Sequence, residues 1–366
     1  MISAILLGTV TAILLAATFL SFLRIAHGFV RSFAFPRLQI LVVTLVTIPL
    51  VVVLVGPPVA SSTVRAAMIV ALLLVAVTQI LCILPFTPLW KRQSRSFEGS
   101  ADDPSAVSIL SYNVKMSNRH YAEALGIAES RDPDIAVFME TDQSWCDALM
   151  PMAKTRPHIL SAPYDNAYGM ILFSRLPLSD TSIDVLVMDE VPSFAMTVTL
   201  RDGQCFRFHA VHPEPPVPYA DSAGRDAELL KVADIVARER LPSVVSGDLN
   251  DVAWSHTTRL FQRVSRLLDP RIGRGFYNTF DARFFFMRWP LDHLFHDARF
   301  AMIDMERLPA GGSDHFPMVF RLALTGTANG SDLPEEEDAA DEAEKKEIIA
   351  EGEALERDAI GVDWEK

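Results

Sequence analysis

The sequence predicts an α/β (α+β) fold, a sandwich with a mixed β-sheet, preceded by three transmembrane helices. Two features of the chain indicate this. Three long apolar runs occupy the first ninety residues, and each is about as long as a helix that crosses a bilayer. From Val107 onward, short apolar runs of strand character alternate with helical stretches, some in hairpin-like order. This pattern is typical of a mixed rather than a purely parallel sheet.

A membrane anchor is predicted for residues 1–90. Ile2–Leu23, Leu38–Val55 and Ala66–Trp90 contain no Asp, Glu, Lys or Arg, which is the composition of membrane-spanning helices. One run of this kind also fits a buried core helix or a cleaved signal peptide. A signal peptide needs a basic N-terminal region, and MISAILLG has none. Three runs in succession favour a multi-pass anchor, with the lipid bilayer as its partner.

Basic residues in the short loops predict how the anchor is oriented. Three lie between the first two apolar runs, three follow the third run, and one lies between the second and third: Arg24, Arg31 and Arg37; Lys91, Arg92 and Arg95; and Arg65. The positive-inside rule then predicts a cytoplasmic domain, with the N-terminus outside. Three charges per loop can be overridden, so the extracytoplasmic side remains the alternative.

The segment after the anchor, residues 91–106, is polar and without periodicity, which predicts a linker. The large domain is expected at 107–325. Its strands are predicted at AVSILSYNV, IAVFME, GMILFSR, FAMTVTL, CFRFHAVH, PSVVSGDLN, WPLDHLFH, RFAMIDMERL and HFPMVFRLAL, and its helices at RHYAEALGIAESRDPD and ADSAGRDAELLKVADIVARERL. Ser255, shortly after GDLND, is a candidate cap for a further helix.

Charge differs between three parts of the chain. Residues 1–100 carry seven basic residues and one acid, 101–325 carry 22 basic and 30 acidic residues, and 326–366 carry 4 basic and 15 acidic residues. The middle part has no basic excess, so a duplex-DNA footprint is not visible and nucleic acid is not the favoured partner. The acidic segment 326–366 predicts a disordered tail, partly helical around Ala340–Arg357, with docking to a partner as the alternative.

Polar side chains follow several predicted strands at the point where each strand ends. They are Asn113 in ILSYNV, Glu140 in AVFMETD, His212 in FHAVHP, Asp248 and Asn250 in VVSGDLN, Asp292 in PLDHLF, and Asp314 and His315 in GGSDHFP. Taken singly, each has an ordinary explanation as a turn residue, a solvated carboxylate or a satisfied histidine. Six such strand ends in one domain predict a shared functional site.

The GDLN motif is the most informative of these strand ends. Residues two apart in an extended segment share a face, so Asp248 and Asn250 are expected to point into the same space. Gly247 has no side chain, which permits the close approach of a backbone or ligand. The motif therefore predicts that the side chains of Asp248 and Asn250 lie beside a point where a backbone or ligand approaches Gly247 closely.

These motifs, in this order, resemble the endonuclease/exonuclease/phosphatase superfamily, the metal-dependent phosphoesterases related to DNase I. The resemblance covers residues 107–323 and depends on the combination of Asn113, Glu140, GMILFSRLPL, His212, GDLN, PLDH and GSDHFP. It implies a four-layer sandwich of two mixed β-sheets flanked by helices, with the site at one edge of the sheets. The multi-helix anchor is similar to that of bacterial membrane-bound members, which implies the bacterial inner (cell) membrane.

The resemblance also implies a divalent cation. Phosphoester hydrolysis needs an activated water and neutralisation of the phosphoryl oxygens. Mg²⁺ prefers carboxylate and amide oxygens and keeps several waters, so few protein ligands suffice. Glu140 and Asn113 are the implied ligands, with Asp314 as a further candidate. Mn²⁺ is the alternative ion.

The catalytic roles follow from the same resemblance. Asp248 is the candidate that orients or deprotonates the attacking water, and Asn250 positions the phosphate or that water. His315 is expected to donate to a phosphoryl oxygen, while Asp292 accepts from its other ring nitrogen and fixes its orientation. His212 is expected to be a second phosphate contact.

Some residues depart from the family pattern or have an open role. Lys115 stands where some nucleases of the family place an acid, so a second metal ligand is absent there. His212 is followed by Pro213 in HPEPPVP, which predicts a stiff loop beside the site. Trp289 is a candidate substrate-binding aromatic or a packing residue. His209 and Arg175 are interpreted as structural, Arg175 as an ion-pair partner.

Three functions are compatible with the sequence. The first is a membrane-anchored, metal-dependent hydrolase of phosphoric esters, whose substrate is a phosphodiester or phosphomonoester in a lipid or lipid-linked phosphate. The second is an endonuclease or exonuclease with the same site. The third is a non-catalytic membrane scaffold that binds partners through its acidic tail. The presence of every expected catalytic residue type favours the enzymes.

Overall fold

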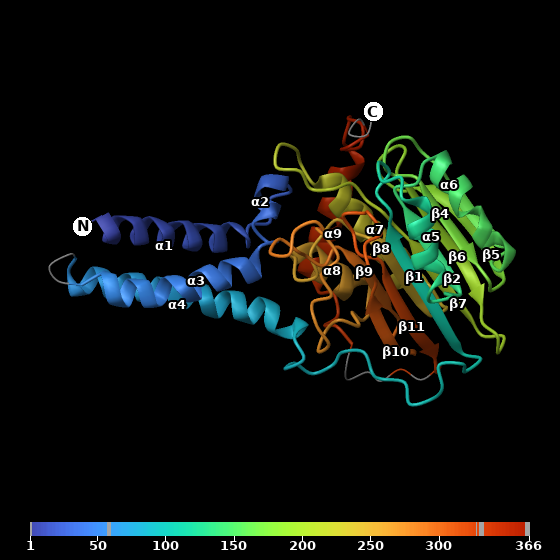
Figure 1. Ribbon diagram of the computed structural model, residues 1–366, viewed down its shortest axis with the longest axis horizontal. Helices are drawn as coiled ribbons and strands as arrows, with labels where there is room; N and C mark the ends of the chain where they lie inside the picture. Colours follow the sequence, from blue (N-terminus) through green and yellow to red (C-terminus); the bar gives the residue numbers. More distant parts are fainter. Residues whose placement is uncertain (1, 57–59, 327, 329–332, 363–366) are drawn as a thin grey trace.

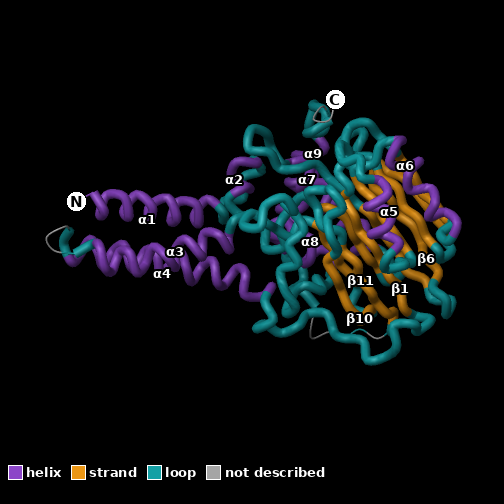
Figure 2. Tube along the Cα trace, viewed as in Figure 1, coloured by secondary structure: helices purple, strands orange, loops and turns teal. Residues whose placement is uncertain are grey.

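Two packed β-sheets and a projecting bundle of helices make up the protein (Figure 1). The computed structural model describes residues 2–56, 60–326, 328 and 333–362. The bundle holds the N-terminal helices, while the sheets and their covering helices form the domain that follows. Figure 2 shows the helical bundle on one side and the strands on the other.

The three long helices of the bundle confirm the predicted apolar segments. They are α1 (Ile2–Leu20), α3 (Arg37–Leu54) and α4 (Ser62–Ile83), and a short helix α2 (Gly28–Ser32) joins the first two. Each of the three is long and apolar enough to cross a membrane, the last span running to Phe86 at the end of the 3₁₀ helix η1 (Leu84–Phe86). Most large apolar side chains on their outer surface are exposed, as expected for helices that face lipid.

The strands form two mixed sheets, as the sequence predicts. The first has the order β10-β11-β1-β2-β4-β3 and the second β5-β6-β7-β8-β9. The strands are β1 (Ala106–Asn113), β2 (Ile135–Met139), β3 (His158–Ala162), β4 (Met170–Ser174), β5 (Leu178–Val185), β6 (Pro192–Thr199), β7 (Cys205–Ala210), β8 (Ser243–Asp248), β9 (Asp292–His296), β10 (Phe300–Arg307) and β11 (Met318–Leu324). Each sheet contains one parallel pair, β1 with β2 and β7 with β8.

Helices cover the outer face of each sheet, which completes the four layers. They are α5 (Tyr121–Glu129), α6 (Gln143–Leu149) and η2 (Met150–Lys154) on the first sheet, and α7 (Ala223–Arg238) and α8 (His256–Ser265) on the second. Alternate apolar residues of both sheets meet in a central core that includes Ile109, Met196 and Phe208. Ser255 caps α8 by accepting from Thr258 N at 2.9 Å, so the predicted cap is confirmed.

Three elements of the domain are not predicted by the sequence pattern. Strand β5 has the sequence LSDTSIDV and is mostly exposed, because it forms an edge of its sheet and needs no apolar face. Strand β3 is likewise a short edge strand. Helix α6 has only seven residues, which is too few for a helical period to show.

The N-terminal helical bundle is packed directly against the domain. The domain-side ends of α3 and α4 form an apolar cluster with residues from the site-bearing loops, among them Trp254, Phe280 and Leu291. Trp254 Nε1 donates to Ala34 O at 2.7 Å. The buried Arg31 guanidinium lies 2.8 Å from Asp226 Oδ2. Anchor and domain therefore share one core.

The expected linker also lies on the domain. Phe97 N donates to Met302 O at 2.8 Å, and His296 Nε2 is 2.8 Å from the hydroxyl of the buried Ser94. Gln93 Oε1 accepts from Asp269 N at 2.9 Å. Polar composition predicts a free segment here, whereas the polar groups bond to the backbone and side chains of the domain.

The acidic tail carries helix α9 (Ala339–Glu353), which packs along α7. Its acids meet basic partners on the domain, as in the pair between Arg263 and Asp341 at 2.7 Å, and Gly352 permits its backbone to approach Ala223 and Ala227. The helix agrees with the partly helical segment expected around Ala340–Arg357. Its packing on the domain corrects the expectation of disorder, because composition does not reveal the basic partners. Residues 327, 329–332 and 363–366 of the tail lie outside the described residues.

Candidate active site

Strand pairing brings the predicted residues to one end of the two sheets. Strand β1 is parallel to β2 and pairs Asn113 with Met139, so Asn113 lies beside the start of the loop that carries Glu140. Strand β8 is antiparallel to β9 and pairs Asp248 with Asp292. Asn113 and Asp248 therefore end their strands, whereas Asp292 begins β9 and Asp314 and His315 precede β11, which corrects the expectation that all of these residues follow strands.

Gly247 sets the position of Asp248. A Cβ at Gly247, whose φ is +153°, would lie 1.9 Å from Val211 O. The chain of β7 continues through Val211 toward His212, so the absent side chain lets the two site-bearing strands lie close together. The close approach expected from the sequence is therefore that of a neighbouring backbone.

Asn113 links the two halves of the site. Its Nδ2 donates to Glu140 Oε1 at 2.8 Å and to Asp248 Oδ2 at 3.1 Å, and its Oδ1 accepts from Lys115 N at 3.0 Å. One amide group from the first sheet thus orients a carboxylate from each sheet. This fixes the separation of Glu140 and Asp248.

His315 lies between two aspartates. Its Nδ1 is 2.8 Å from Asp292 Oδ2, and its Nε2 is 3.4 Å from Asp248 Oδ2. Burial by itself lowers the pKa of His315, but the charges of Asp292 and Asp248 outweigh it and raise the pKa to about 10. An imidazolium held in this way has a fixed orientation and a proton that points at Asp248.

His212 and Asn250 complete the surroundings of Asp248. His212 Nε2 is 3.9 Å from Asp248 Oδ2, and burial lowers the pKa of His212 to about 4 despite that carboxylate. Asn250 N donates to Asp248 Oδ1 at 2.9 Å, and Asn250 Nδ2 donates to Pro213 O at 3.0 Å. Asp248 is therefore contacted by a neutral and a charged imidazole, and burial raises its pKa.

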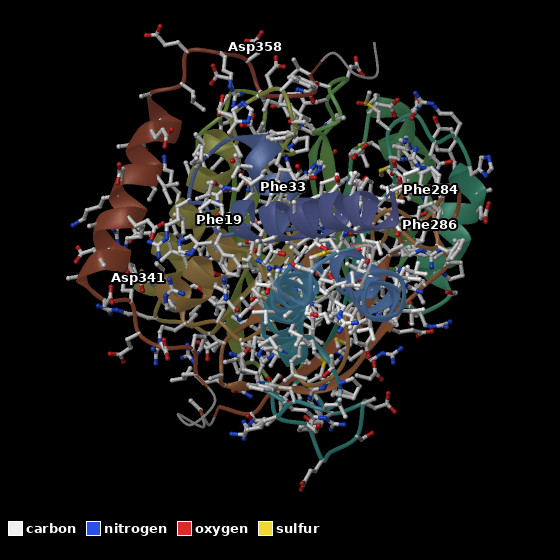
Figure 3. The ribbon with its side chains drawn as sticks, turned by 90° about the vertical axis from the view of Figure 1, so that its left-hand side faces the viewer. Phe19, Phe33, Phe284, Phe286, Asp341 and Asp358 are labelled. Carbon is white, nitrogen blue, oxygen red and sulfur yellow. The ribbon has the colours of Figure 1, made fainter. Side chains whose placement is uncertain are left out.

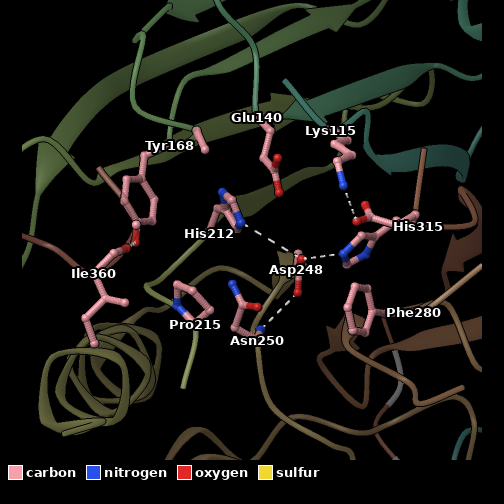
Figure 4. A pocket seen from close by; sticks show the side chains of 13 residues that line it. Lys115, Glu140, Tyr168, His212, Pro215, Asp248, Asn250, Phe280, His315 and Ile360 are labelled. Atoms are coloured by element: carbon pink, nitrogen blue, oxygen red, sulfur yellow. Dashed lines mark hydrogen bonds and ion pairs between the residues drawn. The ribbon is translucent and has the colours of Figure 1, made fainter. Parts of the chain in front are cut away.

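A cavity of about 200 Å³ opens beside these groups. Figure 4 shows Asp248 at its centre, with His212 and His315 on two sides and Glu140 nearby. The lining residues that the sequence predicts are Glu140, His212, Asp248, Asn250, Asp314 and His315. Asn113 and Asp292 bond to lining residues from behind.

Glu140 is the carboxylate that best fits a divalent cation. It is half-buried, and within the described part of the chain it accepts from Asn113 Nδ2 at 2.8 Å and from Met116 N at 3.3 Å, with no cationic side chain at hydrogen-bond distance. Burial first, and then the charge of Asp314, raise the pKa of Glu140 to about 7. A largely desolvated carboxylate with no cation in direct contact is costly, and a hard cation with oxygen ligands supplies that contact. Glu140 thus suits the ion that the sequence implies. Asn113 turns its Nδ2 toward Glu140 and its Oδ1 toward Lys115 N, so its amide group would have to be reversed for Asn113 to ligate the ion through oxygen.

The other candidate ligands already have partners. Asp314 Oδ2 lies 2.7 Å from Lys115 Nζ and 3.5 Å from Arg283 NH2, so its charge is compensated by side chains. Asp248, Asp292 and His315 also offer ligand atoms within 4.8 Å of one another. However, both ring nitrogens of His315 face carboxylates, so this triad is better suited to holding a proton than a metal.

Trp289 is not among the residues that line this cavity, which agrees with the packing alternative given for it rather than with a substrate-binding role. It packs against Phe35 of the anchor and Phe280, with ring centroids 5.8 and 6.3 Å away. Phe280 lines the cavity instead and contacts the His315 ring at 4.9 Å. The sequence predicts an aromatic residue beside the site, but it does not show whether Trp289 or Phe280 lines the cavity.

Several lining residues are missed by sequence reasoning. Tyr168 and Ile360 face His212 across the cavity, and Tyr168 OH donates to Ile360 O. Ile360 belongs to the acidic tail, and nothing in its local sequence indicates a site. Lys115 was noted only as a departure from the family pattern, yet it lines the cavity and pairs with Asp314.

Three site residues have strained backbone conformations. Lys115, Glu140 and Asn250 have φ values of 59°, 57° and 50°, a region that non-glycine residues rarely adopt. Such conformations persist where surrounding contacts hold them, as they do at functional sites. His209 and Arg175 lie elsewhere, Arg175 pairing with Asp132 and Asp134, which agrees with their structural interpretation.

Comparison with known proteins identifies the family. The model of the Endonuclease/Exonuclease/phosphatase family matches residues 110–315, more than half of the chain, and this range includes every site residue that the sequence predicts. The chain belongs to the endonuclease/exonuclease/phosphatase family. Members of this family are metal-dependent hydrolases of phosphoric esters, and the enzyme described here carries the expected residues in one cavity. No curated protein matches its sequence significantly.

Solved structures with a similar fold come from distant sequences. Humanized D. rerio TDP2 with 14 mutations is 15% identical, covers 60% of this chain and 99% of its own, and has a TM-score of 0.49. A family protein from Bacteroides thetaiotaomicron is 18% identical, with 60% and 98% covered and a TM-score of 0.47. The human Nocturnin catalytic domain with bound sulfate is 15% identical, with 60% and 95% covered and a TM-score of 0.48.

Metal affinity is expected to fall as the pH is lowered through about 7, the pKa of Glu140. Protons compete with the cation for this carboxylate, so each pH unit below that value should weaken apparent affinity by up to about tenfold. Calorimetric titration of the purified protein with Mg²⁺ or Mn²⁺ at several pH values measures this. Glu140→Gln, which cannot ionise, should bind weakly at every pH; a native affinity that is independent of pH would contradict the assignment of Glu140.

The wall formed by the tail is expected to depend on Arg357. Its guanidinium lies 2.7 Å from the fully buried Glu214 and 2.8 Å from Asp221, and Ile360 N also donates to Glu214 at 3.0 Å. Arg357→Ala leaves Glu214 buried without its cation, so residues 354–362 should detach and be cleaved faster in limited proteolysis. Lys346→Ala on α9, which removes only an exposed pair with Glu342, is the control and should leave the rate unchanged.

Proposed function

We propose that this protein is a membrane-anchored, divalent-metal-dependent phosphoesterase that acts on a lipid or lipid-linked phosphate. The single observation that carries the proposal is the place of the cavity. Phe280 forms its wall and also belongs to the apolar cluster that joins the domain to α3 and α4. Catalytic groups that share a core with membrane-type helices are held close to a bilayer, where phospholipid headgroups are the nearest phosphoesters.

The proposed base is Asp248. Burial raises its pKa, and a raised pKa makes a carboxylate a better proton acceptor. Its Oδ1 is held by Asn250 N and its Oδ2 by Asn113 Nδ2, so the carboxylate has one orientation. A water in the cavity beside Asp248 can therefore be aligned for attack on phosphorus and deprotonated as it attacks.

The two histidines have different proposed roles because their protonation differs. His315 is charged and held by Asp292, so it can donate to a phosphoryl oxygen where negative charge develops. His212 stays neutral at physiological pH because burial lowers its pKa to about 4, and a neutral ring contacts the phosphate through one N–H. Asn250 lines the same cavity and positions the water or phosphate.

The cation is proposed to bind at Glu140 and Asn113, with Mg²⁺ as the preferred ion and Mn²⁺ as the alternative. When bound, it supplies positive charge for the phosphoryl and leaving oxygens. Lys115, which pairs with Asp314 at the cavity wall, adds a second positive charge from the protein itself. Together these groups neutralise a phosphate within an apolar surround.

The proposed location is the bacterial inner membrane, with the domain in the cytoplasm. Six of the seven basic residues of the first hundred lie toward the domain side of the three helices, which supports the positive-inside orientation. A reporter fused at Lys366, such as a cytoplasmically active fluorescent protein, tests the side. Activity of a periplasm-specific reporter at that position would contradict it.

A nuclease is the second candidate because a basic groove adjoins the site. The groove is lined by Lys115, Arg119, His120 and Arg283 together with Asp314. However, Arg119 pairs with Asp142 at 2.6 Å, and Arg283 pairs with Asp281. Most of the positive charge is therefore compensated within the protein, which makes the groove weaker than a typical nucleic-acid surface.

The deciding experiment is a substrate screen with the full-length protein in lipid nanodiscs. An isolated 97–325 fragment is unsuitable, because anchor and tail both pack into the domain. The substrates are phospholipids, lipid pyrophosphates, plasmid DNA and single-stranded DNA, each with Mg²⁺ or Mn²⁺ and with Asp248→Ala as the inactive control. Metal-dependent lipid hydrolysis supports the proposal, and hydrolysis of DNA alone overturns it in favour of a nuclease. A phenotype of the protein in cells that survives Asp248→Ala would instead favour a scaffold.

A further inference from the structure

An exposed aromatic loop lies beside the membrane-type helix α3. The loop has the sequence FFFM, residues 284–287, and 83% of Phe285 and 56% of Phe286 are exposed. Phe284 and Met287 are 46% and 42% exposed. Four consecutive exposed apolar residues are unusual on a water-facing surface and mark a contact with a partner or membrane.

Direct contacts place this loop against the start of α3. Gln39 Nε2 donates to Phe286 O at 2.9 Å. Phe285 and Phe286 line an apolar groove with Leu38, Val42 and Val43 of α3. In Figure 3, which looks along the bundle toward the domain, Phe284 and Phe286 lie close to the helices.

The depth of the loop follows from helix geometry. Helix α3 has 18 residues, so it spans about 27 Å, close to the roughly 30 Å thickness of the hydrocarbon core. Its first residue, Arg37, therefore lies near one boundary of that core. Val43 lies six residues further on, about 9 Å deeper along the axis. Aromatic side chains packed beside Leu38–Val43 thus reach the interface and the outer part of the apolar layer.

The same loop is connected to the catalytic cavity. It leaves the domain at Phe280, which lines the cavity, and returns at Trp289, whose backbone pairs with that of Phe280. Ala282 N donates to Asp314 O at 2.7 Å. Arg283 and Arg288 flank the apolar residues; Arg283 pairs with Asp281 and Arg288 Nε donates to Phe284 O at 3.0 Å, so both charged groups stay at the base of the loop, behind its exposed apolar tip.

We propose that residues 284–287 insert into the bilayer interface beside α3 and hold the mouth of the catalytic cavity at the level of the lipid headgroups. The occupant of this apolar surface is the lipid bilayer, because the surface is continuous with that of a helix built to face lipid. Insertion is independent of the reaction. The consequence for substrate access rests on the proposed lipid-phosphoesterase function.

Insertion is tested with a fluorescent probe at position 285 in the full-length protein. Phe285→Cys is labelled with an environment-sensitive nitrobenzoxadiazole dye in a background where Cys82, Cys146 and Cys205 are replaced by alanine. The matched control is Ile183→Cys on edge strand β5, which is also exposed and apolar. In vesicles of phosphatidylglycerol and phosphatidylethanolamine, the dye at 285 should emit at shorter wavelength and be quenched by spin-labelled acyl chains, whereas the dye at 183 should not. Equal, water-like emission at both positions overturns the inference.

The effect on catalysis is tested separately. Replacing Phe284, Phe285 and Phe286 together by serine should lower hydrolysis of vesicle phospholipid by about tenfold or more, because their apolar surface no longer favours insertion. Hydrolysis of the water-soluble bis(p-nitrophenyl) phosphate should be unchanged, and an equal loss on both substrates would overturn the inference. A dye at 285 that is quenched by lipid in a protein without lipid hydrolysis leaves insertion supported and rejects only the lipid substrate.

Discussion

Asp248→Asn is expected to lower kcat by about 10²–10⁴-fold, the usual contribution of a positioned proton acceptor. The substitution keeps the size of the side chain, so the contacts with Asn250 N and Asn113 Nδ2 are only rearranged. What is lost is the negative charge that takes a proton from water and that faces His315 at 3.4 Å. Because the loss concerns the transition state more than substrate binding, KM should change little.

Steady-state kinetics with a soluble diester and with the lipid identified in the screen measure this effect. Asp304→Asn is a suitable control, since Asp304 lies on edge strand β10 and forms only an exposed pair with Arg321 of β11, and its kcat should equal that of the native enzyme. If Asp248→Asn kept a kcat close to native, Asp248 would not be the base, and Glu140 would become the next residue to test.

Gly247→Ala is expected to destabilise the domain by roughly 2–6 kcal/mol, the sum of backbone strain and overpacking. A Cβ at this position would overlap Val211 O at 1.9 Å, and the φ of +153° is unfavourable for alanine. Strands β7 and β8 would have to separate, which moves Asp248 away from His212. The variant should therefore lose activity together with stability.

Thermal unfolding in detergent, followed by the fluorescence of the buried Trp145 and Trp254, measures the loss, which should be roughly 5–20 °C in Tm. Gly126→Ala is the matched control. Gly126 lies within helix α5 and a Cβ there meets nothing within 4 Å, so this change should be neutral or stabilising by about 0.5–1 kcal/mol. A Tm for Gly247→Ala equal to that of Gly126→Ala would show that the close approach of the strands is not required.

The buried strands could be predicted because each appears in the sequence as a short run of apolar residues. GDLN, with its glycine and two polar residues, follows an apolar run that becomes β8 between two neighbours. By contrast, the edge strand β5 is mostly exposed and carries no apolar alternation for a pattern to detect. The predicted elements are thus those whose side chains must be buried, and the missed elements are those at edges.

The candidate site shows the same division. Asn113 and Asp248 are 135 residues apart along the chain, yet Asn113 donates hydrogen bonds to both Asp248 and Glu140. The family resemblance, which depends on the order of the motifs, predicted that these residues share a site. The choice of Phe280 rather than Trp289 as the wall of the cavity was not predictable, because both are aromatic and nearby. The contribution of Ile360 to the cavity wall was not predictable either. It depends on an ion pair between Arg357 and Glu214, which are far apart in the sequence.

By itself, the sequence determined three apolar membrane-type helices, a mixed-sheet domain and the polar residues that close its strands, because burial and strand periodicity are local properties of the chain. Only the tertiary structure decided that anchor, linker and tail all pack on the domain around the cavity. Such contacts depend on complementary partners such as Arg31 with Asp226 and Arg263 with Asp341. Composition records that these charges exist, but only the fold determines which of them meet.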